Sequence, residues 1–161
     1  MKPLSQIVLN PSQQANAGPL RYYQVHAVSL RTRPDLRSGY EIDEYQLHAH
    51  PDAVEYFEEL AQGPLASCLG AAYGYPVLVN PANTILFATV SGTGYTLVRL
   101  PEAERKAVLT SFSGKVKPAQ GESHFQDFGE EWMVFDLFGV AREAIRAWFM
   151  SAYAYTDTKS V

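Results

Sequence analysis

Two histidines, His48 and His50, stand two residues apart in the stretch YQLHAHPDAVEYFEEL. In an extended strand, residues two apart point to the same face, so this pair could present two imidazole rings together. Imidazole is the commonest metal ligand in proteins, but a catalytic zinc ion usually takes three protein ligands. The pair therefore raises the question of where a third ligand could come from.

Two segments before the helix-like region could position such a ligand. Residues 21–32 (RYYQVHAVSLRT) are rich in β-branched and aromatic side chains, which favours a long strand. Residues 33–39 contain Pro, Asp, Ser and Gly and predict a turn. Residues 40–49 alternate between apolar and polar side chains over much of their length and predict the returning strand, although their acidic content also allows the start of a helix.

The register of this hairpin decides whether the histidines meet. A register that pairs Arg31 with Asp43, two opposite charges, also places His26 opposite His48. We then expect His26, His48 and His50 on one face, as a candidate transition-metal site. A shift of one residue sends His26 to the other face. In that case the pair ends a strand and His50 precedes a proline-started helix, which is the reading we favour.

Other chemical motifs are sparse. The single cysteine, Cys68, lies among small apolar residues, which indicates a buried, unreactive thiol. The stretch SGTGYT has glycines but lacks the lysine and the helix of a phosphate-binding loop, so it predicts a hairpin turn. Arg99 stands on an apolar strand and could bind an anion, face solvent or pair with an acid on a neighbouring strand. We find no serine-hydrolase motif and expect no cofactor.

Composition limits the possible partners. The chain has 161 residues and a net charge of −4, without the basic stripe that nucleic-acid binding requires. Its apolar runs are too short to span a membrane, and the N-terminus lacks the apolar core of a signal peptide. We therefore expect a cytoplasmic protein that binds neither nucleic acid nor membrane.

Helix and strand signals together predict one α+β domain over residues 1–161. It should contain a mainly antiparallel sheet of about five strands packed against helices, with an amphipathic helix at the C-terminus. Helices are expected at 51–62, 64–72, 101–110 and 139–154. Further strands are expected at 77–79, 84–90 and 95–100. Residues 84–90 are apolar on both faces, which places them in the middle of the sheet.

Four segments are less regular. Residues 1–19 predict an irregular N-terminal arm in which SQIVL docks, 113–129 a long polar loop, and 156–161 a frayed tail. Residues 130–138 fit a strand by propensity, but a helix continuous with the C-terminal one is the alternative.

The function expected from these features is protein binding. An aromatic cluster near the C-terminus must be mostly core, and any part left exposed would mark an interaction surface. Its members are Phe125, Phe128, Trp132, Phe135, Phe138, Trp148, Phe149, Tyr153 and Tyr155. With few catalytic motifs and an acidic balance, we expect a small non-catalytic module, such as an inhibitor or immunity-like protein, that binds another protein. The alternative is a metal-dependent enzyme that uses His26, His48 and His50. A small-ligand pocket between the sheet and the C-terminal helix is a third possibility.

Overall fold

The protein is described by a computed structural model, which covers residues 4–32, 41–42, 45–46 and 48–159. Its centre is a six-stranded antiparallel sheet with the strand order β3-β4-β5-β6-β8-β7. The strands are β3 (Leu69–Ala72), β4 (Tyr75–Val79), β5 (Leu86–Ser91), β6 (Tyr95–Arg99), β7 (Val116–Pro118) and β8 (Trp132–Asp136). The expected α+β class with an antiparallel sheet is confirmed.

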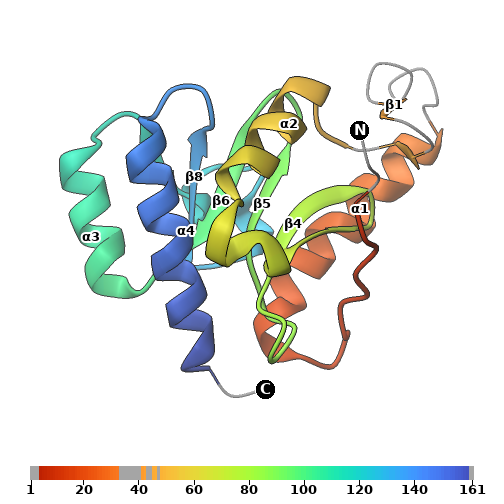
Figure 1. Ribbon diagram of the computed structural model, residues 1–161, viewed down its shortest axis with the longest axis horizontal. Helices are drawn as coiled ribbons and strands as arrows, with labels where there is room; N and C mark the ends of the chain where they lie inside the picture. Colours follow the sequence, from red (N-terminus) through yellow and green to blue (C-terminus); the bar gives the residue numbers. More distant parts are fainter. Residues whose placement is uncertain (1–3, 33–40, 43–44, 47, 160–161) are drawn as a thin grey trace.

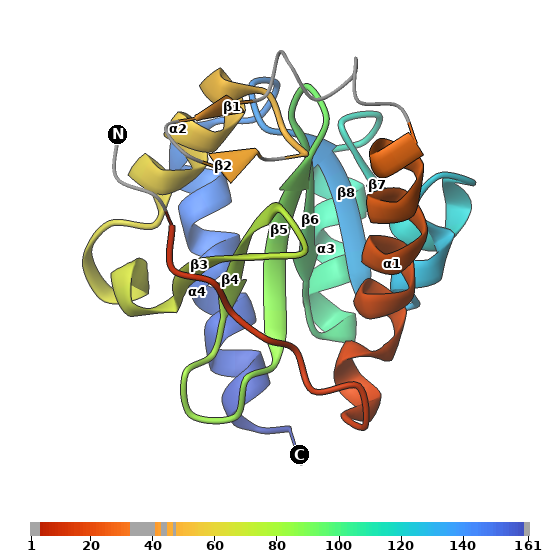
Figure 2. The same ribbon diagram turned by 90° about the vertical axis from the view of Figure 1, so that its right-hand side faces the viewer.

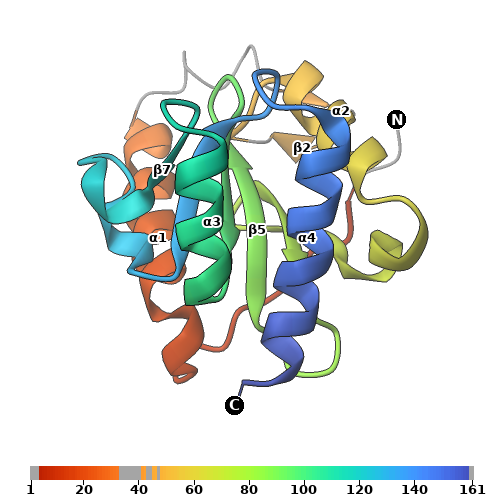
Figure 3. The same ribbon diagram turned by 90° about the vertical axis from the view of Figure 1, so that its left-hand side faces the viewer.

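Helices cover both faces of this sheet. They are α1 (Ala17–Thr32), α2 (Pro51–Leu60), α3 (Glu102–Ser111) and α4 (Arg142–Asp157). Figures 1 and 3 show α3 and α4 on one face, and Figure 2 shows α1 on the other. The described residues also include the short 3-10 turns η1 (Gln14–Asn16), η4 (Gly63–Cys68), η5 (Ala119–Gly121) and η6 (Gln126–Phe128).

The central strand β5 is buried along its whole length, as the sequence predicts. Phe87 and Val90 join the core beneath α2 and α4, whereas Leu86 joins the core beneath α1. A strand that is apolar on both faces loses contact with water on both sides, and this favours a middle position. The two cores therefore meet at β5.

Three of the expected helices are confirmed with small changes in their ends. Pro51 occupies the first turn of α2, and Val54, Phe57 and Leu60 are buried at helical spacing. Helix α3 follows Pro101, and α4 presents Trp148 to the core. Residues 130–138 contain strand β8 and not a continuation of the C-terminal helix.

The expected strand over residues 21–32 is wrong, because these residues belong to helix α1. Leu20, Tyr22 and Tyr23 are buried and His26 is half-buried, whereas Val25 is 55% exposed. This spacing follows the helical period of 3.6 residues. Strand propensity was overridden because a helix in this place covers the second face of the sheet.

The expected strand over 40–49 is also wrong within the described residues. Strands β1 (Glu41–Ile42) and β2 (Tyr45–Gln46) pair with each other in antiparallel fashion and do not form one continuous strand. The turn expected at 33–39, and the pairing of Arg31 with Asp43, lie outside the residues whose side chains the structure describes. Because residues 21–32 are helical, the described parts of the two segments form no hairpin that would bring His26 opposite His48.

Three smaller expectations also change. Residues 64–72 form the η4 turn and strand β3 and not a second helix. The polar loop at 113–129 contains edge strand β7 and two 3-10 turns. The tail does not fray at its start, because helix α4 continues to Asp157 and Lys159 pairs with Glu131.

The N-terminal arm docks along one edge of the sheet, as expected for SQIVL. The amide of Ile7 donates to Ala71 O over 2.8 Å, and the amide of Ala71 donates to Ser5 O over 2.8 Å. This contact covers part of edge strand β3, which would otherwise expose unpaired backbone groups. None of the helices in the described residues has the length and apolarity needed to cross a membrane.

Candidate functional site

Residues 48–50 cross the end of the sheet between two hairpin turns. The amide of His48 donates to Gly74 O over 2.8 Å, in the β3–β4 turn. Gly92, in the β5–β6 turn, donates to His48 O over 2.9 Å and accepts from the amide of His50 over 2.7 Å. Ala49 between them is fully buried. The backbone of this segment therefore ties the two turns together at one end of the sheet.

His50 serves as the cap of helix α2. Its Nδ1 accepts a hydrogen bond from the amide of Asp52 over 3.1 Å and lies 3.9 Å from the Asp52 carboxylate. A cap of this kind satisfies one of the backbone amides that a helix leaves unpaired at its start. His50 therefore has the helix-entry role that the sequence also allowed.

His26 and His48 belong to one aromatic cluster and are linked through two tyrosine rings. His26 stacks on Tyr22 with 4.0 Å between ring centroids, and His48 stacks on Tyr75 at 4.6 Å. Tyr22 and Tyr75 pack edge to face at 5.7 Å. The cluster lies on the α1 side of the sheet, at the end that residues 48–50 cross.

A third histidine of the cluster is His124, whose position the sequence did not indicate. Its ring contacts His26 edge to face, with 4.8 Å between centroids. Partial burial, and then the charge of His26, lower the pKa of His124. Within the described part of the chain, no three His, Cys, Asp or Glu side chains gather in a way that could hold a metal ion.

Hydroxyl groups form the buried base of the same cluster. The Tyr22 hydroxyl and Ser91 Oγ share a hydrogen bond of 2.9 Å. Burial raises the pKa of both Tyr22 and Tyr75, so both phenols stay protonated at neutral pH. Ser91 is thus paired with a neutral phenol, which cannot activate it as a general base would. The contacts support a rigid packing role for this group and supply no serine nucleophile.

Two exposed aromatic side chains and the half-buried ring of Tyr56 lie at the same end of the sheet. We call Tyr56, Tyr95 and Phe138 the aromatic ridge. Phe138 stacks on Tyr56 with 5.5 Å between ring centroids. A Cβ on Gly94 would lie only 3.3 Å from the Phe138 ring, so this ring packs directly beside the turn that leads into Tyr95. Tyr95 and Phe138 are 53% and 55% exposed.

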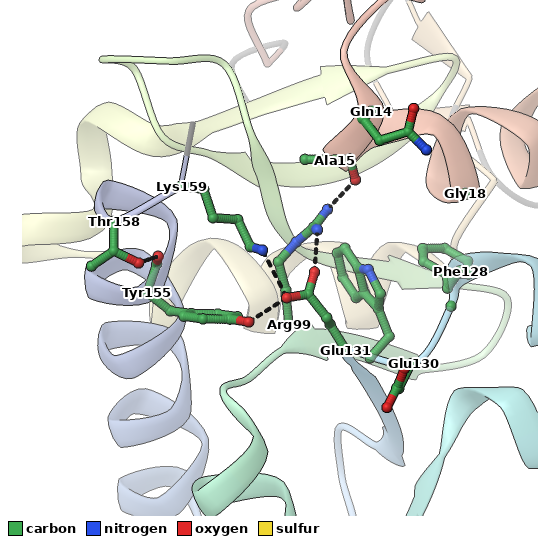
Figure 4. Close-up of a pocket in the computed structure, with 12 residues that line it drawn as sticks. Gln14, Ala15, Gly18, Arg99, Phe128, Glu130, Glu131, Tyr155, Thr158 and Lys159 are labelled. Carbon is green, nitrogen blue, oxygen red and sulfur yellow. Dashed lines mark hydrogen bonds and ion pairs between the residues drawn. The ribbon is translucent and has the colours of Figure 1, made fainter. Parts of the chain in front are cut away.

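A separate pocket lies where the start of α1, the strands β6 and β8 and the end of α4 meet (Figure 4). We call it the Arg99 pocket. It has a volume of about 590 Å³, and its walls include Gln14, Gly18, Phe128, Trp132, Tyr155 and Lys159. Arg99 and Glu131 form its floor.

Arg99 is almost fully buried, with 2% of its side chain exposed. Its Nε donates to Leu86 O over 2.9 Å, one terminal nitrogen to Ala15 O over 2.7 Å, and the other to Glu131 over 3.0 Å. The guanidinium also lies over Trp132, 4.7 Å from the ring centre. Of the three roles the sequence allowed for Arg99, pairing with an acid near a neighbouring strand is the one observed.

Glu131 accepts from two further groups. Lys159 Nζ lies 2.7 Å from its carboxylate, and the Tyr155 hydroxyl donates a short hydrogen bond to it. Burial alone would raise the pKa of Glu131, but the hydrogen bonds from Lys159 and Tyr155 and the charge of Arg99 outweigh burial and lower it. Glu131 therefore stays ionised, and it joins strand β8 to the end of helix α4.

Cys68 is buried, as the sequence predicts, and burial raises the pKa of its thiol. This is the opposite of what a cysteine nucleophile requires. Comparison of the chain with models of known families, with characterised proteins and with solved structures finds no match.

Proposed function

We propose that this chain is a small, non-catalytic protein-binding module that docks its partner on the aromatic ridge. The observation that carries the proposal is the exposure of Tyr95 and Phe138, each more than half exposed, on one end of the sheet. Tyrosine and phenylalanine are enriched at protein interfaces because each adds a large contact area with few rotatable bonds. Isolated exposed apolar residues need no explanation, but neighbouring aromatic rings form a patch.

The ridge is held in place before any partner arrives. Asp136 Oδ1 accepts from the amide of Phe138 over 3.0 Å, and the amide of Leu137 donates to Gly94 O over 2.9 Å. The guanidinium of Arg142 lies over the Tyr56 ring, 5.9 Å from its centre. A fixed surface loses less conformational entropy on binding, which favours affinity.

Two cavities beside the ridge offer room for side chains of a partner. Each has a volume of about 320 Å³, and both are lined by Tyr95, Glu122 and Phe125. An interface typically places an apolar anchor in such a hollow and surrounds it with polar contacts. Tyr95 thus stands between two recesses, and we propose that the partner inserts apolar side chains on either side of it.

Charge has a secondary part in this proposal. The net charge of −4 favours encounter with a basic partner. On the rim of the ridge, however, Glu59 already lies 3.6 Å from Arg142, and Glu122 lies 3.6 Å from Lys117. Apolar contact should therefore supply most of the affinity, and salt should slow association more than it weakens the complex. The buried cysteine suits the reducing cytoplasm, which we propose as the location.

Site-specific photo-crosslinking in native cells tests the proposal. A photoreactive phenylalanine analogue replaces Tyr95 or Phe138, and in control proteins it replaces Leu109 or Met150, which are 36% and 39% exposed on α3 and α4. We expect a discrete adduct from the two ridge positions and none from the controls. In a second experiment, Phe138→Ser should abolish co-purification of the captured protein, and Met150→Ser should leave it unchanged.

Two results would refute ridge docking. One is the same adducts from all four positions, because this would reflect chance contact. The other is undiminished co-purification with Phe138→Ser, because the ridge would then contribute no binding free energy. An adduct of twice the chain mass would identify the partner as a second copy of the chain.

A further inference from the structure

We propose that the Arg99 pocket binds a small organic anion, whose carboxylate or phosphate monoester group is carried on a planar, apolar body. This site is independent of the aromatic ridge. Among the described residues, none that lines the Arg99 pocket also lines the two cavities beside Tyr95. Its volume of about 590 Å³ lies in the range of small-molecule sites.

The first argument is the balance of charge on the pocket floor. Arg99 and Lys159 both contact the single carboxylate of Glu131, so two cations share one anion. Glu130 also borders the pocket, but it is exposed and points away from the Glu131 carboxylate (Figure 4). The four charges of the lining balance, but Arg99 and Lys159 face only the carboxylate of Glu131, so an anion that enters the pocket meets two cations beside one carboxylate.

The second argument concerns hydrogen-bond donors. An ammonium group carries three N–H donors. Lys159 directs one toward Glu131, and its ammonium lies 4.7 Å from the centre of the Tyr155 ring. Its side chain is 22% exposed, so the remaining donors can reach an anion in the pocket. Arg99 is buried and fixed by its own contacts, so it supplies charge and Lys159 supplies the direct contact.

The third argument is the shape of the walls. Phe128, Trp132 and Tyr155 border the charged floor, and Phe128 and Trp132 expose only 4% and 1% of their surface. Gly18 brings α1 so close to η6 that an added Cβ would lie 2.3 Å from Asp127 O. The wall at this point is backbone and cannot be widened by a rotamer change. A fixed backbone wall on one side and the half-buried Tyr155 ring on another leave room for a flat molecule, whose anionic end would contact Lys159.

Ligand and Glu131 compete for the same cations in this arrangement. Glu131→Gln removes the competing charge while it keeps a side chain of the same shape. We therefore expect this variant to bind anions more tightly, whereas Lys159→Gln should bind them more weakly. Opposite responses of two neighbouring residues are not expected if the substitutions only loosen the fold.

NMR titration of the purified full-length protein tests this proposal. The probes are benzoate, phenyl phosphate and the uncharged benzyl alcohol, each added to about 10 mM, which detects millimolar affinity. The indole N–H signal of Trp132 reports on the pocket, and that of Trp148, which lies in the other core, is the internal control. Trp148→Phe assigns the two signals by loss of one.

We expect at least one anion to shift the Trp132 signal with saturation, and Lys159→Gln to weaken its affinity about tenfold, the loss of one charged contact. Lys106→Gln removes an exposed lysine paired with Glu102 and should change nothing. Saturation by benzoate alone, or by phenyl phosphate alone, supports the proposal and identifies the anionic group. The proposal is overturned if no anion shifts the Trp132 signal, if benzyl alcohol binds as tightly, or if Lys159→Gln binds like wild type.

Discussion

Replacing Glu131 by Gln removes the charge that balances the buried Arg99. Gln keeps the size of the side chain and one acceptor oxygen, and the bonds from Arg99 to Leu86 O and Ala15 O remain. Removing one partner of a buried ion pair costs about 3–5 kcal/mol. The Glu131 side chain is 29% exposed, and water screens part of the interaction. We therefore expect the free energy of unfolding to fall by about 2 kcal/mol at neutral pH.

Urea unfolding at pH 7 measures this change, with Glu102→Gln as the control. Glu102 lies 3.3 Å from Lys106, and both side chains are more than 70% exposed. Exposed pairs of this kind contribute little, so the control should lose less than about 0.5 kcal/mol. Equal losses in the two variants would refute the argument that Glu131 neutralises a buried charge.

The dependence on pH gives a second check on the same residue. The pKa of Glu131 lies below its ordinary value of 4.5 in the folded protein. A lowered pKa means that the stabilisation is present above pH 4.5 and disappears as the pH falls through the folded value. The difference between wild type and Glu131→Gln should therefore shrink in acid. A difference that grows below pH 4.5 would contradict this sign.

Two further changes test the packing around α1. Gly18→Ala should cost about 1–3 kcal/mol, because the new Cβ would lie 2.3 and 2.5 Å from two backbone carbonyl oxygens of η6. The control is Gly121→Ala, which has no atom within 4 Å of the new Cβ and should stay within about 0.5 kcal/mol of wild type. Thermal or urea unfolding measures both variants, and equal losses of stability at the two positions would contradict the close approach of α1 to η6. Tyr22→Phe should cost about 1 kcal/mol, because it removes the buried 2.9 Å hydrogen bond to Ser91. The control is Tyr95→Phe, which alters an exposed ring and should leave the free energy of unfolding unchanged. If Tyr22→Phe lowers the free energy of unfolding no more than Tyr95→Phe does, the buried hydrogen bond contributes nothing to stability.

The elements that the sequence predicts well carry local signals. Pro51 and the helical spacing of Val54, Phe57 and Leu60 define α2, and the structure agrees. The glycines of SGTGYT define a hairpin turn, in which Gly92 has a φ of 61° that most side chains disfavour. These signals depend on the backbone of a few neighbouring residues, so no distant contact is needed to interpret them.

The region around α1 shows where local signals fail. Tyr22, Tyr23 and Val25 favour a strand by intrinsic propensity, yet they lie in a helix. The helical period was present in Leu20, Tyr22, Tyr23 and His26, but the β-branched and aromatic composition of the segment outweighed it in the prediction. The metal hypothesis relied on the strand interpretation, so its geometric basis was lost with that strand.

Tertiary structure alone decided which side chains meet. Strand β8 pairs with both β6 and β7, and this insertion brings Glu131 beside Arg99. Helix α4 then adds Lys159, and the packing of α1 against the sheet brings His26 to His124. The sequence by itself determined the α+β class, the central strand and the caps of α2, because backbone hydrogen bonding and hydrophobic periodicity act over short distances. It could not determine strand order or helix placement, because these depend on the free energy of burying both faces of the sheet at once.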